Sequence, residues 1–143
     1  YAELQKQIVI EITEEESIEY HALETKKNAL GFEGAFALDD YGSGYSNEKS
    51  LLDLAPKYIK VDLSIIRDID TDPDKQQIVE NIVAYAHKRD MKIVAEGLET
   101  PEEIQKVLEL EVDLLQGFYL ARPEPVPGNI NEDALKIIAA FYK

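Results

Sequence analysis

Cysteine is absent from this chain of 143 residues, which excludes disulfide bonds and thiolate metal sites. Long apolar runs are absent as well, because charge interrupts each hydrophobic stretch within a few residues. A bilayer span needs roughly 20 apolar residues in succession. The chain also opens without the apolar segment of a secretory signal. These absences are compatible with a reducing cytosol, and we expect a cytoplasmic location.

Positive charge is scarce in the sequence. Lysine and arginine together number 15 against 29 acidic residues, which gives a net charge of −14. Such a surface repels polyanions at long range, so binding of a nucleic acid polymer through a basic face is disfavoured. A phosphate-bearing ligand would need a cation as mediator. Apart from Glu14, we interpret the acidic runs at 14–16, 70–72 and 102–103 as solvated helix starts and loop tips.

The apolar residues that are present suffice for one core. Hydrophobic residues make up 45% of the chain, and its length is too short for two ordinary domains. No linker-like segment divides the sequence. We therefore expect a single domain over residues 1–143.

Five short apolar runs predict buried β-strands. They lie at residues 8–12, 34–38, 58–62, 92–96 and 112–116. Because each run is almost uniformly apolar, we expect a parallel sheet that is covered on both faces. Two architectures fit this pattern, a complete doubly wound sheet of five strands or about five-eighths of an eight-stranded barrel.

Helices are predicted between the strands from the spacing of apolar residues and from capping signals. The spacing indicates helices at 17–30, near 51–54 and around 78–86. Thr100, Pro101 and Glu103 form the signature of a capping box with proline at the first helical position. Asn131 is expected to cap a last helix. The inward-facing residues of that helix are expected to be Ala134, Leu135, Ile138 and Phe141.

Polar residues stand at the end of every predicted strand. They are Glu11, Asp39 with Asp40, Lys60, Glu96 and Gln116. In a parallel sheet these ends lie on one rim, where converging carboxylates repel one another unless they are protonated or bind a cation. Carboxylate oxygens are the ligands that Mg²⁺ and Mn²⁺ prefer. The strand ends therefore predict a site for such a cation.

Five segments of the chain carry a resemblance to a known family. They are Glu11-Ile12-Thr13-Glu14, Asp39-Asp40-Tyr41-Gly42-Ser43-Gly44-Tyr45-Ser46, Ile59-Lys60-Val61-Asp62, Val94-Ala95-Glu96-Gly97-Leu98-Glu99-Thr100, and Gln116-Gly117-Phe118-Tyr119 followed by Arg122-Pro123. In this order and spacing they resemble the successive signatures of EAL domains. The resemblance implies an α/β fold, the C-terminal part of a TIM-like (β/α)8 barrel with about five βα units and parallel strands.

The resemblance also implies a chemistry. EAL enzymes are phosphodiesterases that hydrolyse the bacterial second messenger cyclic di-GMP to pGpG with two Mg²⁺ or Mn²⁺ ions. Carried over position by position, the metal ligands would be Glu11, Asp39, Asp40 and Glu96. Lys60 would orient or activate the attacking water. The resemblance thus implies that Lys60 and Glu96 are the catalytic residues. Gln116 would contact the substrate, and Glu14 would steady the glycine-containing loop after Asp40.

Parts of the family pattern are missing from the sequence. The resemblance implies two further metal ligands, the glutamate of the Glu-Ala-Leu motif and an asparagine, and both would precede Glu11. Only ten residues do so here. We therefore expect a partial EAL domain that lacks the N-terminal strands of the barrel and is inactive by itself. A degenerate domain that binds cyclic di-GMP as a receptor without cleaving it is the alternative.

A phosphoacceptor receiver domain also carries an acidic pair and a lysine at strand ends. In such a domain the acidic pair follows the first strand and the lysine follows the fifth. Here the pair follows the second predicted strand and the lysine follows the third, which argues against a receiver. The EAL resemblance further implies a homodimer, and a parent protein with sensory or diguanylate cyclase domains and sometimes a membrane tether.

Overall fold

The computed structural model describes residues 2–13, 25, 28–29, 31–44 and 48–143. Within these ranges the chain forms five strands and six helices. The strands are β1 (Val9–Thr13), β2 (Ala35–Tyr41), β3 (Tyr58–Val61), β4 (Lys92–Ala95) and β5 (Leu114–Leu115). The helices are α1 (Ala2–Gln5), α3 (Glu48–Leu54), α4 (Leu63–Ile66), α5 (Pro73–His87), α6 (Pro101–Glu109) and α7 (Glu132–Phe141). The helix expected at 17–30 falls mostly outside the described residues.

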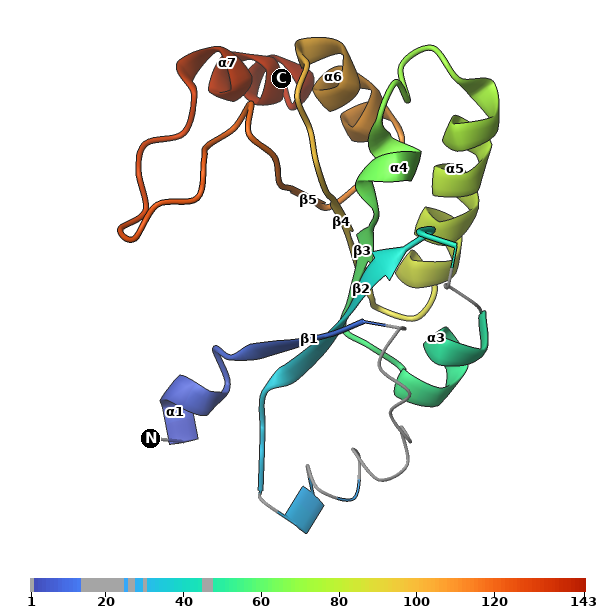
Figure 1. The fold of residues 1–143 in the computed structure, drawn as a ribbon, viewed down its shortest axis with the longest axis vertical. Helices are drawn as coiled ribbons and strands as arrows, with labels where there is room; N and C mark the ends of the chain where they lie inside the picture. Colours follow the sequence, from blue (N-terminus) through green and yellow to red (C-terminus); the bar gives the residue numbers. More distant parts are fainter. Residues whose placement is uncertain (1, 14–24, 26–27, 30, 45–47) are drawn as a thin grey trace.

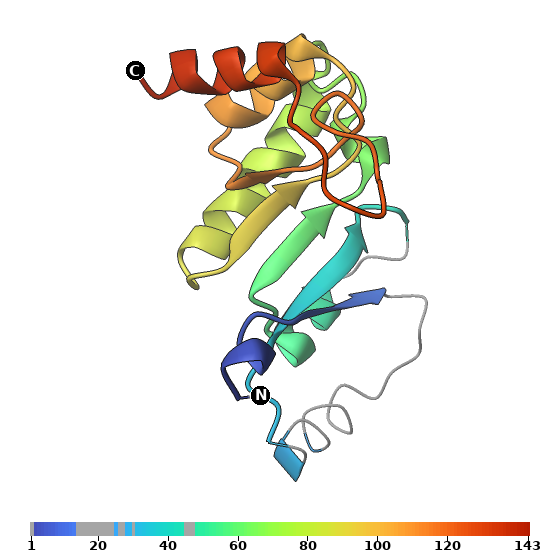
Figure 2. The ribbon, with the colours of Figure 1, turned by 90° about the vertical axis from the view of Figure 1, so that its left-hand side faces the viewer.

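The five strands form one parallel sheet in the order β1-β2-β3-β4-β5. Each strand therefore pairs with its neighbour in the sequence, without the change of direction that marks a doubly wound sheet. Figures 1 and 2 show α3, α4, α5 and α6 on the same side of the sheet. Of the two architectures that fit the sequence, this arrangement agrees with part of a barrel and not with a doubly wound sheet.

The core lies between the sheet and these helices. Leu38, Ile59 and Ile93 from the three central strands are fully buried, and Val79 and Ala86 pack onto them from α5. Apolar side chains at helical spacing put one face of α5 against β4. This packing fixes the positions of the strands whose ends carry the polar residues.

Two features of the helices differ from expectation. The four-residue helix α4 was not predicted, and it begins after Asp62, whose carboxylate accepts a hydrogen bond from Ser64 N at 2.9 Å. In α7, Ala134 is buried, but Leu135 and Phe141 are exposed because the helix packs mainly on α6. A period of 3.6 residues identifies a face but not how much of it is covered.

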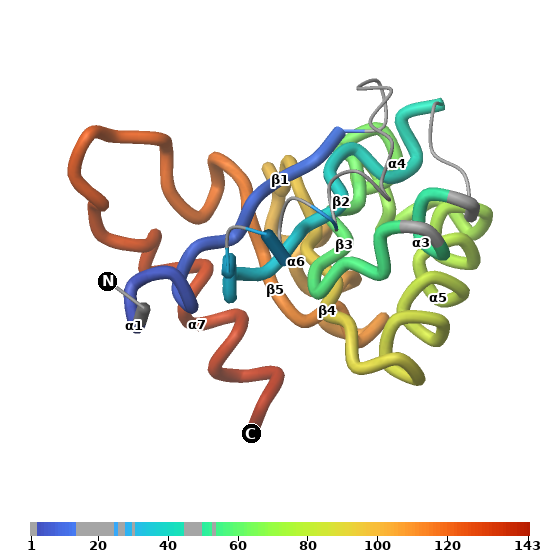
Figure 3. Tube along the Cα trace, turned by 90° about the horizontal axis from the view of Figure 1, so that it is seen from below, coloured from blue at the N-terminus to red at the C-terminus, as the bar shows by residue number. Residues whose placement is uncertain are grey.

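The outer strands of the sheet are β1 and β5, and neither pairs with a further strand among the described residues. Ile8, Val9 and Ile10 at β1 are 47%, 42% and 39% exposed. On the other side, the long connection from β5 to α7 extends away from α5, as Figure 3 shows. No described helix is both long enough and apolar enough to cross a membrane.

Candidate metal centre

The parallel register brings the polar strand ends to one rim of the sheet. Thr13 is opposite Asp39, Lys60 is opposite Val94, and Ala95 is opposite Leu115. Glu96 and Gln116 directly follow their strands, so their side chains leave the sheet at the same end. The predicted convergence is present in the structure. Glu14 lies outside the described residues.

An irregularity in β2 lets two adjacent aspartates share the rim. Adjacent side chains of a regular strand point to opposite faces. Asp40 has a φ of 55°, and the pairing of β2 with β3 shifts register between Leu38 and Tyr41. Among the described residues, Asp39, Asp40 and Glu96 form a group whose ligand oxygens lie within 4.8 Å of one another.

Lys60 lies at the centre of this rim. Its Nζ is 2.8 Å from Glu11 Oε1, 3.0 Å from Glu96 Oε1 and 3.6 Å from Asp39 Oδ1, while its side chain is only 8% exposed. Burial lowers the pKa of Lys60, but the hydrogen bonds with Glu11 and Glu96 and the nearby negative charges outweigh it and raise the pKa above its ordinary value. Lys60 therefore stays charged and partly neutralises the carboxylates.

The surroundings of Glu96 change the pKa of its carboxyl group. Burial and the charge of Asp39 raise its pKa to about 7, although Lys60 opposes the shift. One ammonium is therefore not enough to neutralise the group near neutral pH. A second positive charge would relieve the remaining repulsion.

The donor set fits a hard divalent cation. Three carboxylates with converging oxygens match the preference of Mg²⁺ and Mn²⁺ for oxygen ligands. Glu11, also predicted as a ligand, lies outside this group; its carboxylate is about half exposed and binds Lys60 instead. Asp39, Asp40 and Glu96 are thus the residues that could hold the cation.

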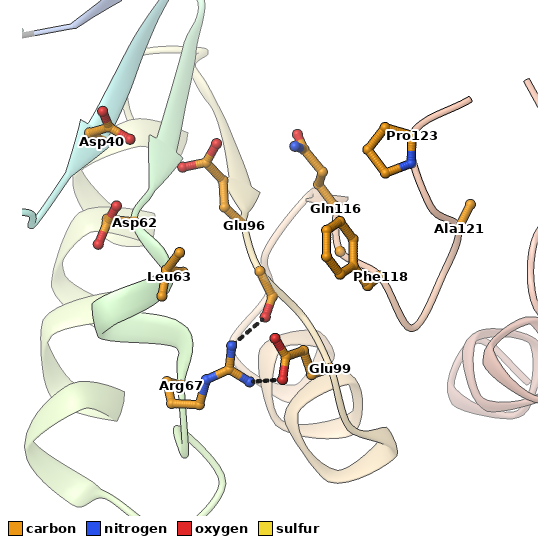
Figure 4. Close-up of a pocket in the computed structure, with 12 residues that line it drawn as sticks. Asp40, Asp62, Leu63, Arg67, Glu96, Glu99, Gln116, Phe118, Ala121 and Pro123 are labelled. Carbon is orange, nitrogen blue, oxygen red and sulfur yellow. Dashed lines mark hydrogen bonds and ion pairs between the residues drawn. The ribbon is translucent and has the colours of Figure 1, made fainter. Parts of the chain in front are cut away.

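A pocket of about 320 Å³ opens beside the carboxylates. Figure 4 shows Asp40 and Asp62 on one side of it and Gln116, Phe118 and Pro123 on the other. Its volume lies in the range of small-molecule sites. The pocket offers an apolar wall next to a group that would attract a cation.

Two lining residues were not singled out from the sequence. Phe118 is 58% exposed at the pocket, while the neighbouring Tyr119 packs against the core. Adjacent aromatic residues in a loop give no periodicity from which the exposed one can be chosen. Arg67 also lines the pocket, from the end of the unpredicted helix α4.

Comparison with known proteins identifies the family. Residues 1–123 match the EAL domain. The chain is 36% identical over 118 residues to the probable cyclic di-GMP phosphodiesterase PdeG of Escherichia coli, covering 81% of this chain and 23% of that protein. It is 44% identical over 94 residues to the cyclic di-GMP phosphodiesterase PdeL of the same organism, covering 66% of this chain and 25% of PdeL. The chain thus spans about a quarter of these relatives.

Solved structures agree with the sequence match. Klebsiella pneumoniae BlrP1 in a complex with manganese and cyclic di-GMP superposes with a TM-score of 0.76 at 35% identity, over 83% of this chain and 31% of BlrP1. A standalone EAL protein from Vibrio cholerae bound to cyclic di-GMP gives a TM-score of 0.80 at 31% identity, over 91% of this chain and 56% of that one. The chain belongs to the EAL domain family and has its α/β, TIM-barrel-like fold.

Proposed function

We propose that this chain supplies the metal-binding rim of a phosphodiesterase that hydrolyses cyclic di-GMP to pGpG. The observation that carries the proposal is the group of Asp39, Asp40 and Glu96 beside the buried ammonium of Lys60. The relatives named cyclic di-GMP phosphodiesterases and the neighbours in complex with this nucleotide support the substrate.

Asp39, Asp40 and Glu96 would hold Mg²⁺ or Mn²⁺, with Glu11 able to join from the edge strand. The intact domain would use two such ions. When bound, the cations would supply charge neutralisation at the phosphate and a lowered pKa for water. The complex of BlrP1 with manganese and a complex with calcium support the use of a divalent cation.

Lys60 and Gln116 would act on the reactants directly. Lys60 keeps its proton, so it would orient the attacking water and offset negative charge that builds on the phosphate. Gln116 lines the pocket and would hydrogen-bond to the substrate. The exposed ring of Phe118 offers a flat apolar surface for a guanine.

We further propose that a polypeptide of these 143 residues does not turn over substrate by itself. Glu11 is about half exposed on β1, an outer strand of the described sheet, and three carboxylates are a weak set for two ions. Residues that hold metal ligands in position raise the cation affinity of a site. Alignment of the reacting groups raises the rate of the reaction. A domain that binds cyclic di-GMP without cleaving it is the second candidate.

The test uses Mn²⁺, cyclic di-GMP and chromatographic detection of pGpG. The chain alone should give no product. A chimera in which this chain replaces the matched part of the Vibrio cholerae EAL protein should release pGpG and lose that activity with Glu96→Gln. A folded chimera that binds cyclic di-GMP but never cleaves it would overturn the phosphodiesterase proposal and favour the receptor.

A further inference from the structure

The turn that carries Glu96 is held by contacts on several sides. Residues 96–100 connect β4 to α6 without regular structure. Gly97 has a φ of +73°, and a Cβ on it would lie 2.6 Å from Leu63 Cβ, so the turn rests closely on α4. Leu98 N donates to Gln116 O at 3.1 Å, and Leu98 O accepts from Tyr119 N at 3.2 Å. The position of this turn therefore determines where the Glu96 carboxylate points.

Arg67 fastens the same turn from the end of α4. Its guanidinium donates to Gly97 O at 3.4 Å and lies 2.8 Å from Glu99 Oε2, as the dashed lines in Figure 4 mark. Of the described residues that line the pocket, Arg67 alone carries a positive charge. A planar guanidinium can hold two acceptors in fixed directions, which a lysine ammonium does less well.

The buried carboxylate of Glu103 also contacts both the turn and Arg67. Glu103 is 1% exposed and accepts hydrogen bonds from the backbone N–H groups of Asp68, Glu99 and Thr100. Its Oε1 also lies 3.5 Å from Arg67 Nη1. The end of α4 and the turn after Glu96 are thus tied together through one network, and a shift of Arg67 would move both.

We propose that Arg67 is a positioning residue for Glu96. By holding Gly97 O and the Glu99 carboxylate, it fixes the turn so that Glu96 meets Asp39 and Asp40, and it thereby sets the cation affinity of the three carboxylates. This inference rests on the proposed metal site. Residues that orient metal ligands from outside typically change affinity by about 10- to 100-fold when they are removed.

The test measures the affinity for Mn²⁺ from the electron paramagnetic resonance signal of the free ion, at a temperature where every variant is folded. Arg67→Met should weaken binding by at least about tenfold, and Arg67→Lys should recover part of the loss. Arg89→Met is the matched control, because Arg89 donates to Tyr85 O and stacks on the Tyr85 ring beyond the far end of α5. A merely structural role would lower the unfolding temperature and leave Mn²⁺ affinity unchanged. Unchanged affinity in folded Arg67→Met would overturn the inference.

A second readout separates this inference from the proposed function. In the metal-free protein, the carboxyl ¹³C resonance of Glu96 should shift in Arg67→Met and not in Arg89→Met. If the unsubstituted chain binds no Mn²⁺, the proposed metal site fails, and an unmoved Glu96 resonance would then refute the positioning role. Should Arg67→Met not fold, Glu99→Gln takes its place, because it removes only the half-exposed 2.8 Å partner. Glu99→Gln that alters neither Mn²⁺ affinity nor the Glu96 resonance would equally refute it.

Discussion

The Nζ atom of Lys60 lies between Glu11 on the edge strand and Glu96 after the fourth strand, 2.8 Å from one carboxylate and 3.0 Å from the other. One buried ammonium therefore connects strands that are not neighbours in the sheet. The same ammonium lies 3.6 Å from Asp39 and so offsets negative charge in the group of Asp39, Asp40 and Glu96. Lys60 thus has a role in stability as well as in the proposed chemistry.

Lys60→Met should destabilise the metal-free protein near neutral pH. The methionine fills a similar volume, but the carboxylates lose their counter-charge, and we expect a loss of about 2 kcal/mol in the free energy of unfolding, since Glu11 can still be solvated. Urea unfolding in the presence of a chelator measures the change. Lys57→Met is the control, because Lys57 is exposed and directly precedes the same strand. Equal stability of the two variants would contradict the role of Lys60.

Glu103→Ala should destabilise the fold more strongly than a surface substitution in the same helical turn. It leaves three partly buried N–H groups without the carboxylate that accepts from them, which we expect to cost about 3 kcal/mol. Glu102→Ala changes the exposed neighbour in the first turn of α6 and should stay within about 0.5 kcal/mol of the unsubstituted protein. Thermal unfolding of both variants measures the two changes in stability. A similarly small loss for each variant would count against the role of the Glu103 network.

Glu111→Gly and Asp90→Gly should both stabilise the protein. Both residues follow a helix with positive φ, 64° and 59°, and both are exposed. Glycine occupies such helix ends without strain, so we expect a gain of about 0.5 to 1 kcal/mol, larger at Glu111 because aspartate tolerates this conformation better. Chemical unfolding checks the order. A loss of stability at both positions would show that the side chains contribute more than the strain removes.

The free edge of β1 should make the isolated chain self-associate. In the part of the chain that the structure describes, no strand pairs with its outer side, and apolar side chains are exposed along it. Ile10→Lys should shift the population toward monomer in light scattering over a range of concentrations. Val126→Lys replaces a more exposed apolar residue, 75% exposed in the β5–α7 connection, and should not. A monodisperse monomer of the unsubstituted chain at high concentration would refute this prediction.

The strands and their acidic ends could be predicted because buried parallel strands are short apolar runs and the rim follows from their direction. The bounds of the first four strands agree with the predicted runs to within a few residues, while β5 is reduced to Leu114–Leu115. The capping box at Thr100 is confirmed. Positions on one rim are a consequence of topology, which an alternation of strands and helices specifies well.

The rest depends on contacts between distant segments. Glu103 was interpreted with Glu102 as a solvated helix start, and this is wrong for Glu103, because the end of α4 covers it from 35 residues away. The bulge that turns Asp40 toward Asp39 also depends on pairing with β3. Neither Arg67 nor Phe118 shows its role in a local pattern, since both act through the pocket that four separate segments form.

The central claim is that Asp39, Asp40 and Glu96 form a divalent cation site, and a titration with Mn²⁺ tests it most directly. Glu80→Gln on the exposed face of α5 removes the same charge as Glu96→Gln and so controls for the overall negative field. We predict that the unsubstituted chain and Glu80→Gln bind Mn²⁺ alike, while Glu96→Gln binds it at least about tenfold more weakly. Equal Mn²⁺ affinity of all three proteins would contradict the assignment.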